Sequence, residues 1–206
     1  MYFKYNSPIK VSVRRIDMRK KWIVLLIGCL LLGSICVIKI SWKPNLDQSV
    51  IIIREAYQKL ELDSLNGTVY EYPIVPGMPE WEELHSSEKM YAATNIPDEI
   101  LEKMNTDALI ESILTHPLLF SSFIASADSE GKQGLERFSL SCTAVWELYK
   151  RKDAGVLLAY RLIETPINHY ENNVLRFFLE KGEIQKYLSG KVQKAVQVYI
   201  RETQKL

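Results

Sequence analysis

Apolar residues recur every three or four positions from Trp81 to the C-terminus, and this repeat most constrains the fold. The spacing places apolar side chains along one side of an α-helix, whereas a half-buried strand would alternate apolar and polar residues. Turn and capping residues interrupt the repeat often, so the helices are expected to be short. The sequence therefore predicts an all-α domain over residues 81–206. We expect a compact helical bundle, with a short α-solenoid as the alternative.

Helix boundaries follow from prolines, glycines and N-cap residues, with Thr106 and Asp153 as two expected N-caps. The longest helix is expected to follow Gly134 and to end near Lys150, with Trp146 on its inward side. A further helix is expected before the domain. The predicted helices cover residues 48–61, 87–93, a stretch beginning at 95–99, 107–114, 117–124, 135–150, 154–164, 166–182, and 184 to the C-terminus.

A second feature is the uncharged run WIVLLIGCLLLGSICVI at residues 22–38. As a helix this run is about 25 Å long, and extending it through Trp42 brings it close to the roughly 30 Å hydrocarbon core of a bilayer. Basic residues are concentrated before the run, which places the N-terminus in the cytoplasm. We therefore expect residues 22–42 to be a transmembrane signal anchor in the cell membrane. Residues 1–21 would form a basic cytoplasmic tail, and the rest would be extracytoplasmic.

Other interpretations of this region remain open. Residues 37–42 lack the small-x-small pattern that signal peptidase prefers, which favours a retained anchor over a cleaved signal. The sequence LIGC at residues 26–29 is similar to a lipobox, in which Cys29 would be lipidated, but its apolar region would be short. Met18 alone would open an ordinary export signal. A start at Met18 would leave residues 1–17 outside the protein.

The charge balance conceals two different parts. The chain has 26 basic and 25 acidic residues, but residues 1–42 hold 8 of the basic and 1 of the acidic ones, which leaves 18 against 24. An acidic domain is a poor partner for phosphate backbones, so nucleic acid is not an expected partner. Cys142 is the only cysteine after residue 42, so it has no intramolecular disulfide partner there and is expected to be a buried small apolar residue. A domain with so few cysteines suits a bacterial surface protein.

Residues 43–80 are expected to hold a linker, the first helix and a proline-rich loop. A turn at Asn66-Gly67 precedes the extended run 68–72, after which Pro73 and Pro76 favour an irregular surface path. Pro73-x-x-Pro76 is a possible polyproline ligand. The favoured alternative is a loop that packs its own side chains on the domain.

Three aromatic residues flank this loop: Tyr70, Tyr72 and Trp81. Aromatic edges beside prolines can form a platform for a peptide or a glycan, so these residues are the candidate binding site. The favoured alternative is that Trp81 fastens the loop to the helices.

The sequence gives little support for a catalytic site or a metal-binding site. Helical metal sites place Glu-x-x-His or His-x-x-x-His on one face, and only Glu82-x-x-His85 fits, alone and beside a helix start. His116 and His169 lie at helix boundaries. Nucleophile-elbow and phosphate-loop patterns are absent from the sequence. We assign no catalytic residue, no metal site and no cofactor.

Three stretches carry a resemblance: YPIxPGxxEW at 72–81, IPDEILxxMxTxALIE at 96–111, followed by Pro117-Leu118, and ELxxRKDAG at 147–155. Together they resemble a group of uncharacterised exported proteins of gut-type bacteria. The resemblance implies export and a helical domain, and it implies no activity and no functional residues. The chain departs from the group's pattern at Asn105 and at Thr115-His116, where the group has Ser and an Asn/Asp-Tyr pair.

The favoured function is an interaction or scaffold module that binds another envelope protein or a peptide. The alternative is a cell-envelope hydrolase whose site is assembled from scattered acids with His116 or His169. A third hypothesis is a membrane-tethered regulator that signals through residues 1–21. Substrate, partner and oligomeric state are not set by the sequence.

Overall fold

The computed structural model describes residues 44–60, 67–126 and 130–205, and every regular element in these ranges is an α-helix, which confirms the all-α prediction. The helices are α2 (Leu46–Tyr57), α3 (Pro79–Glu82), α4 (Ser87–Thr94), α5 (Asp98–Leu101), α6 (Thr106–Leu114), α7 (Leu119–Ile124), α8 (Lys132–Ser141), α9 (Thr143–Leu148), α10 (Ala154–Glu164), α11 (Tyr170–Leu179), α12 (Gly182–Gln185) and α13 (Gly190–Thr203). Among them, none combines the length and apolarity needed to cross a bilayer. The predicted tail and anchor at 1–42 lie outside the described residues.

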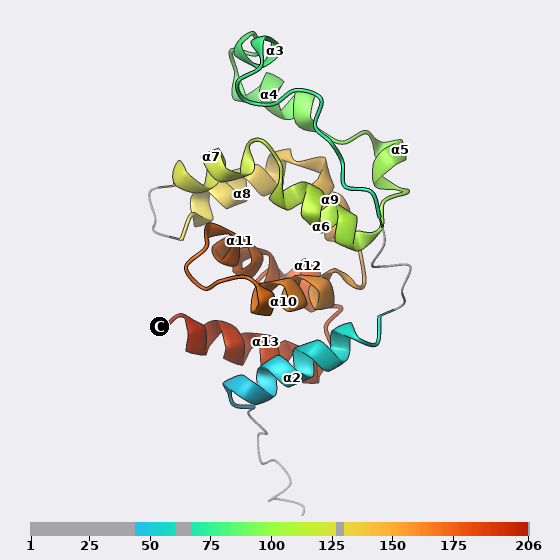
Figure 1. Ribbon diagram of the computed structural model, residues 1–206, viewed down its shortest axis with the longest axis vertical. Coiled ribbons are helices and arrows are strands. Elements are labelled where there is room, and N and C mark those ends of the chain that lie inside the picture. Colours follow the sequence, from blue (N-terminus) through green and yellow to red (C-terminus); the bar gives the residue numbers. More distant parts are fainter. Residues whose placement is uncertain (1–43, 61–66, 127–129, 206) are drawn as a thin grey trace, which may run out of the picture. The chain divides into compact units, whose positions relative to one another are not determined.

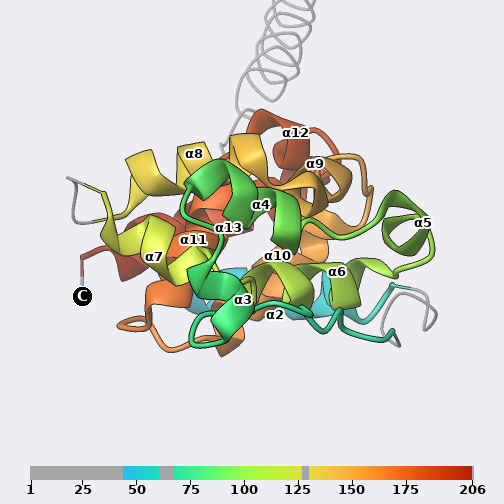
Figure 2. The ribbon, with the colours of Figure 1, turned by 90° about the horizontal axis from the view of Figure 1, so that it is seen from above.

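The helices of the domain lie in layers (Figure 1). Helices α6 to α9 form one layer, α10 to α12 lie below it, and α2 packs against both α13 and α10. The first and last described helices are thus neighbours. The core between the layers contains fully buried Phe138, Phe178, Leu109, Leu158 and Ile53. Seen from above, α4 crosses the outer side of the layer formed by α6 to α9 (Figure 2).

Helix α2 begins two residues earlier than the pattern predicted, because Asn45 and Gln48 form a capping box. The Asn45 Oδ1 atom accepts from the Gln48 N–H at 2.8 Å, and the Gln48 Oε1 atom accepts from the Asn45 N–H at 3.2 Å. These bonds satisfy two backbone donors that a helix start otherwise leaves unpaired. The apolar face of α2 then buries Ile52 and Ile53 against the rest of the domain.

The prediction of one long helix ending near Lys150 was wrong. Cys142 has an extended backbone, with φ −99° and ψ 112°, and it separates α8 from α9. Two contacts from outside the local helix pattern stabilise the break. The Asn95 Oδ1 atom accepts from the Thr143 N–H at 3.2 Å, and the Trp146 indole N–H donates to the Ser139 carbonyl at 2.8 Å. We call this point the α8–α9 break.

The final predicted helix is likewise two helices, α12 and α13, because Ser189 caps a new start and accepts from the Val192 N–H. The structure also differs from the sequence prediction at both expected N-caps in the middle of the domain. Asn105, not Thr106, caps α6 by accepting from the Ala108 N–H at 2.9 Å. Thr106 instead donates to the Asp153 carboxylate at 2.7 Å, and Asp153 makes no cap hydrogen bond to α10.

Candidate functional site

The predicted binding residues Tyr70 and Tyr72 lie on a non-helical segment, residues 67–75, which we call the strap. The Tyr70 N–H donates to the Ser112 Oγ atom at 2.8 Å, and the Tyr72 hydroxyl donates to the Ser112 carbonyl at 2.8 Å. These bonds fasten the strap to α6. Both tyrosines are half-buried, as is Ile74, so much of each side chain is used within the domain.

Trp81 does not share an exposed platform with the two tyrosines. It lies in α3 with only 8% of its surface exposed. Tyr70 and Tyr72 do contact each other, with ring centroids 5.1 Å apart. Ligand binding by these three residues stays a prediction. Trp81 is buried in the domain, whereas Tyr70 and Tyr72 are each partly buried and partly exposed.

His116 is buried beneath the strap, with 4% of its surface exposed. Its Nδ1 atom accepts from the Leu118 N–H at 3.1 Å, so the neutral ring carries its proton on Nε2. Burial lowers the pKa of His116 to about 4, and the backbone carbonyl of Thr94 acts in the opposite direction. Nε2 makes no hydrogen bond of good geometry with the described residues. The neighbouring rings belong to Tyr72, Tyr91 and Phe138, which offer no carboxylate to an acid/base site.

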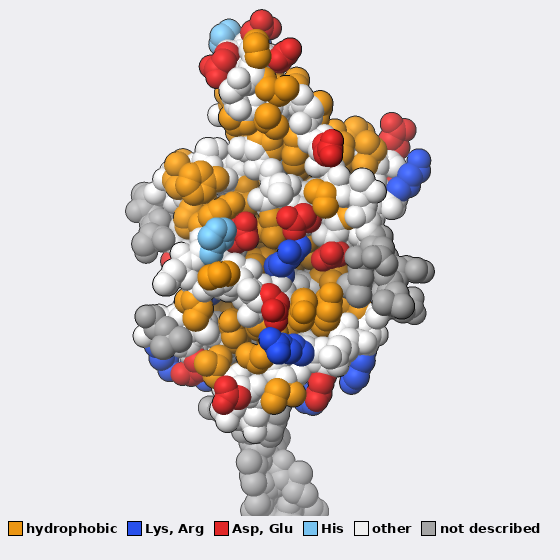
Figure 3. Space-filling model, viewed as in Figure 1, with side chains coloured by type: hydrophobic (Ala, Val, Ile, Leu, Met, Phe, Trp, Pro, Cys, Tyr) orange, Lys and Arg blue, Asp and Glu red, His pale blue; other side chains and the backbone are white. Residues whose placement is uncertain are grey.

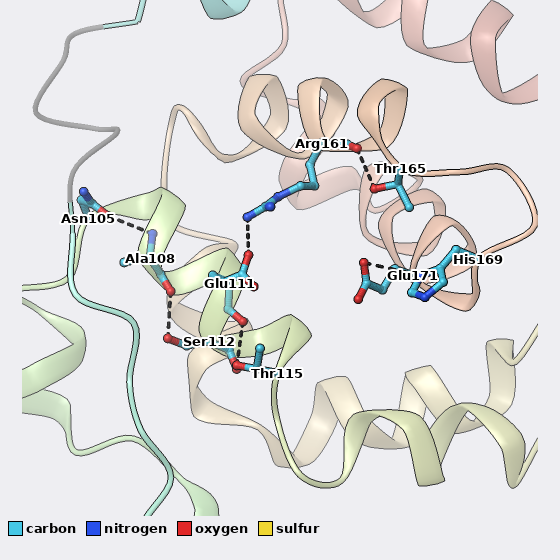
Figure 4. Close-up of polar contacts among 9 residues, drawn as sticks. All are labelled: Asn105, Ala108, Glu111, Ser112, Thr115, Arg161, Thr165, His169 and Glu171. Carbon is cyan, nitrogen blue, oxygen red and sulfur yellow. Dashed lines mark hydrogen bonds and ion pairs between the residues drawn. The ribbon is translucent and has the colours of Figure 1, made fainter.

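His169 lies elsewhere, at the start of α11, with its Nδ1 atom 3.6 Å from the Glu171 carboxylate. Figure 4 shows this pair beside, but separate from, the ion pair that Glu111 of α6 makes with Arg161 of α10. The side chain of His169 is about half exposed. The two histidines of the hydrolase hypothesis are therefore in different surroundings, one buried among aromatic rings and one at the surface.

The third histidine, His85, is exposed and lies between α3 and α4. Acidic side chains gather over the α3–α4 region (Figure 3). Its backbone has φ 38°, a left-handed value that is uncommon for a residue with a side chain. Throughout the described ranges, no three His, Cys, Asp or Glu side chains are grouped so that they could hold a metal ion.

A groove of about 970 Å³ lies between α4 and the helices α7, α8 and α9, and we call it the α4 groove. Its apolar lining includes Met90 and Tyr91 of α4, Leu118 before α7, Leu140 of α8 and Trp146 of α9. Leu140 is 73% exposed and Trp146 is 50% exposed. Large apolar side chains that remain exposed beside a groove are typical of a binding surface.

The position of Trp146 depends on the α8–α9 break. Its indole N–H spans the break to reach the Ser139 carbonyl, which holds the ring in one orientation. Trp146 was predicted to face inward on one continuous helix, and that prediction was wrong. The sequence holds no local signal for this exposure, because the residue that stabilises the break, Asn95, is 48 positions away from Thr143.

Polar groups are interspersed along the α4 groove. The Tyr91 and Ser122 hydroxyls are 3.1 Å apart and connect α4 to α7. Burial raises the pKa of Tyr91, while the bond to Ser122 acts in the opposite direction. Arg137 makes no ion pair with the described carboxylates, and its one hydrogen bond within the described ranges is a 3.4 Å bond to the Ala125 carbonyl. The groove therefore offers the Arg137 guanidinium beside apolar anchors, and the carboxylate of Glu88 in α4 also lines it.

Comparisons with family models, curated proteins and solved structures gave no match to this chain. The resemblance to exported proteins of gut-type bacteria accordingly stays a prediction.

Proposed function

We propose that this protein is a membrane-anchored, extracytoplasmic interaction module whose α4 groove holds an apolar segment of a partner protein. The exposure of Trp146 and Leu140 beside the groove carries the proposal. Covering both side chains removes apolar surface from water, and a tryptophan fixed by its own hydrogen bond loses little conformational freedom on binding.

The partner segment is expected to carry a carboxylate next to an apolar side chain. Arg137 lines the groove and can form a charge-assisted hydrogen bond with such a carboxylate. Asn95 also lines the groove, and its side-chain oxygen is already used by Thr143, which leaves the amide nitrogen to donate to a peptide carbonyl. An apolar peptide segment that places its carboxylate beside Arg137 and away from Glu88 fits this set of groups.

Residues 22–42 supply the anchor in this proposal, and the basic residues before them keep the N-terminus in the cytoplasm. The domain would then face outward. The pairing of α2 with α13 supports a compact bundle, because an open solenoid keeps its first and last helices apart.

Photo-crosslinking in intact cells tests the proposal. A photoreactive residue at Leu140 is expected to capture a partner, and the same probe at Ile51, which is also exposed but lies on α2, is expected not to. Trp146→Ala and Arg137→Ala should each reduce the Leu140 crosslink, and Ile51→Ser should leave it unchanged. Protease added to spheroplasts should degrade the domain.

Equal capture at Leu140 and Ile51 would remove the α4 groove as the binding site. Protection of the domain from external protease would remove the proposed topology. Hydrolysis of cell-wall or peptide substrates that His169→Ala abolishes would replace the binding function by the hydrolase hypothesis.

A further inference from the structure

The backbone of the strap offers hydrogen-bonding groups that the domain leaves unused. Residues 67–72 belong to no helix, and the chain follows a drawn-out path there (Figure 1). Among the amide groups of residues 68–72, that of Tyr70 donates to Ser112, and the others have no partner in the described ranges. Successive residues of an extended chain direct their amide and carbonyl groups to opposite sides. Since the Tyr70 amide points to Ser112 of α6, we expect the amides of Val69 and Glu71 on such a path to face away from α6.

A cleft of about 850 Å³ lies alongside this segment, and we call it the strap cleft. The strap lines one side with Val69, Tyr70 and Glu71, and the other side is lined by Ile100 of α5 and by Lys103 and Met104 after it. Val69 and Ile100 are 36% and 37% exposed. A chain lying in the strap cleft would have free backbone groups on one side and apolar side chains on the other.

We propose that the strap cleft binds an extended peptide by β-strand addition. The peptide backbone pairs with the amide and carbonyl groups of Val69 and Glu71, as at the exposed edge of a sheet. Alternate apolar side chains of the peptide then face Ile100 and Met104. This site is distinct from the α4 groove and requires none of its residues.

The charges around the strap cleft favour a peptide with a basic end. The carboxylates of Glu71 and Glu99 line the cleft against the single ammonium group of Lys103. None of the three makes an ion pair or side-chain hydrogen bond within the described ranges. A lysine at the end of the peptide would therefore meet an excess of negative charge.

The test uses the purified full-length chain and a fluorescein-labelled peptide of sequence Lys-Val-Thr-Val-Thr-Val-Lys. Two further peptides have the same sequence but carry N-methyl groups on alternate backbone amides. One peptide is methylated along one edge of the strand, and the other is methylated along the opposite edge. Because strand addition uses one edge, we expect one N-methylated peptide to bind about tenfold more weakly and the other to bind like the parent. Fluorescence anisotropy measures the three affinities.

Matched variants of the protein test whether the strap backbone pairs with the peptide. Val69→Pro removes an amide that has no partner in the described domain, and Val69→Thr keeps that amide and the branched side chain. We expect Val69→Pro to weaken binding about tenfold and Val69→Thr to preserve it. Ile100→Asp should also weaken binding, and it leaves the strap backbone unaltered. Circular dichroism at 222 nm confirms that each variant is folded.

Three results would overturn the proposal: no binding of the parent peptide at millimolar concentration, equal binding of all three peptides, or equal binding by Val69→Pro. If Val69→Pro fails to fold, the N-methylated peptides and Ile100→Asp decide the question. Trp146→Ala is expected to leave peptide binding unchanged. That result separates the strap cleft from the α4 groove, so either proposal can fail alone.

Discussion

The imidazole ring of His116 stands edge to face against the ring of Phe138, with the centroids 5.0 Å apart and the planes at 85°. Tyr72 of the strap and Tyr91 of α4 lie against the same imidazole, at centroid distances of 4.9 and 6.3 Å. His116 thus joins the strap, α4 and α8 at one buried point. A change in its charge would affect all three segments together.

We expect acid to weaken the fold through His116. Its ordinary pKa is 6.5, and burial lowers the pKa in the folded state to about 4, so the folded protein binds fewer protons than the unfolded chain between these values. The free energy of unfolding should therefore be highest above pH 6.5 and should fall by about 3 kcal/mol as the pH drops to 4. Urea unfolding at several pH values measures this fall.

Carboxylates also lose stabilising interactions in acid, so a matched comparison is needed. His116→Phe should lower stability at neutral pH, because the Leu118 N–H loses its acceptor, but it should reduce the fall between pH 6.5 and 4. His85→Phe, at an exposed position, should keep the full fall. An unchanged fall in His116→Phe would show that the buried imidazole is not its cause.

The apolar repeat predicted much of this fold correctly, because the core faces of helices are local in sequence. Leu109, Ile110 and Ile113 were expected on one face of the helix at 107–114, and all three are buried. The capping box of Asn45 and Gln48 is also local, and attention to the Asn-x-x-Gln spacing would have found it.

The parts that were not predicted depend on distant contacts. The α8–α9 break depends on the hydrogen bond that the Thr143 N–H donates to Asn95. No local pattern in the sequence around Asn95 or around Thr143 predicts that bond. Since the exposure of Trp146 depends on the break, the α4 groove could not be read from periodicity. The strap was different: Tyr70 and Tyr72 were selected from sequence, but their attachment to Ser112 was visible only in the structure.

Substitution of Gly134 should be strongly destabilising. A Cβ atom at this position would lie 1.6 Å from the Ser122 carbonyl oxygen, so Gly134→Ala forces α7 and α8 apart. We expect a loss of about 3 kcal/mol in the free energy of unfolding, measured by urea titration.

Gly182 provides the control for this variant. It is the first residue of α12, and a Cβ atom there would meet nothing within 4 Å. Gly182→Ala should therefore raise stability by up to about 1 kcal/mol, because alanine reduces the freedom of the unfolded chain. Equal losses at Gly134 and Gly182 would contradict close packing of α7 on α8.

Loss of the Asn95 side chain should loosen the α8–α9 break. Asn95→Ala removes the acceptor for both the amide and the hydroxyl of Thr143, each at 3.2 Å. We expect a loss of about 2 kcal/mol in unfolding free energy and faster hydrogen exchange at the Thr143 amide. Asn173→Ala changes an asparagine with no side-chain hydrogen bond in the described ranges and should leave that exchange rate unchanged.

Cys142 should be unreactive in the folded protein although it lies at the α8–α9 break. Its side chain is 1% exposed, and burial raises the pKa of its thiol to about 11, while the backbone amides of Val145 and Ala144 act in the opposite direction. Because the thiolate is the reactive form, alkylation at pH 8 should be about 100-fold slower than in urea.

The measurement requires a protein in which Cys142 is the only thiol, obtained with Cys29→Ser and Cys36→Ser. Iodoacetamide labelling followed by mass spectrometry gives the two rates. Labelling of the folded protein at the unfolded rate would mean that the α8–α9 break opens readily. Adding Asn95→Ala should raise the folded rate, because loss of the bond to Thr143 loosens the chain next to the buried thiol.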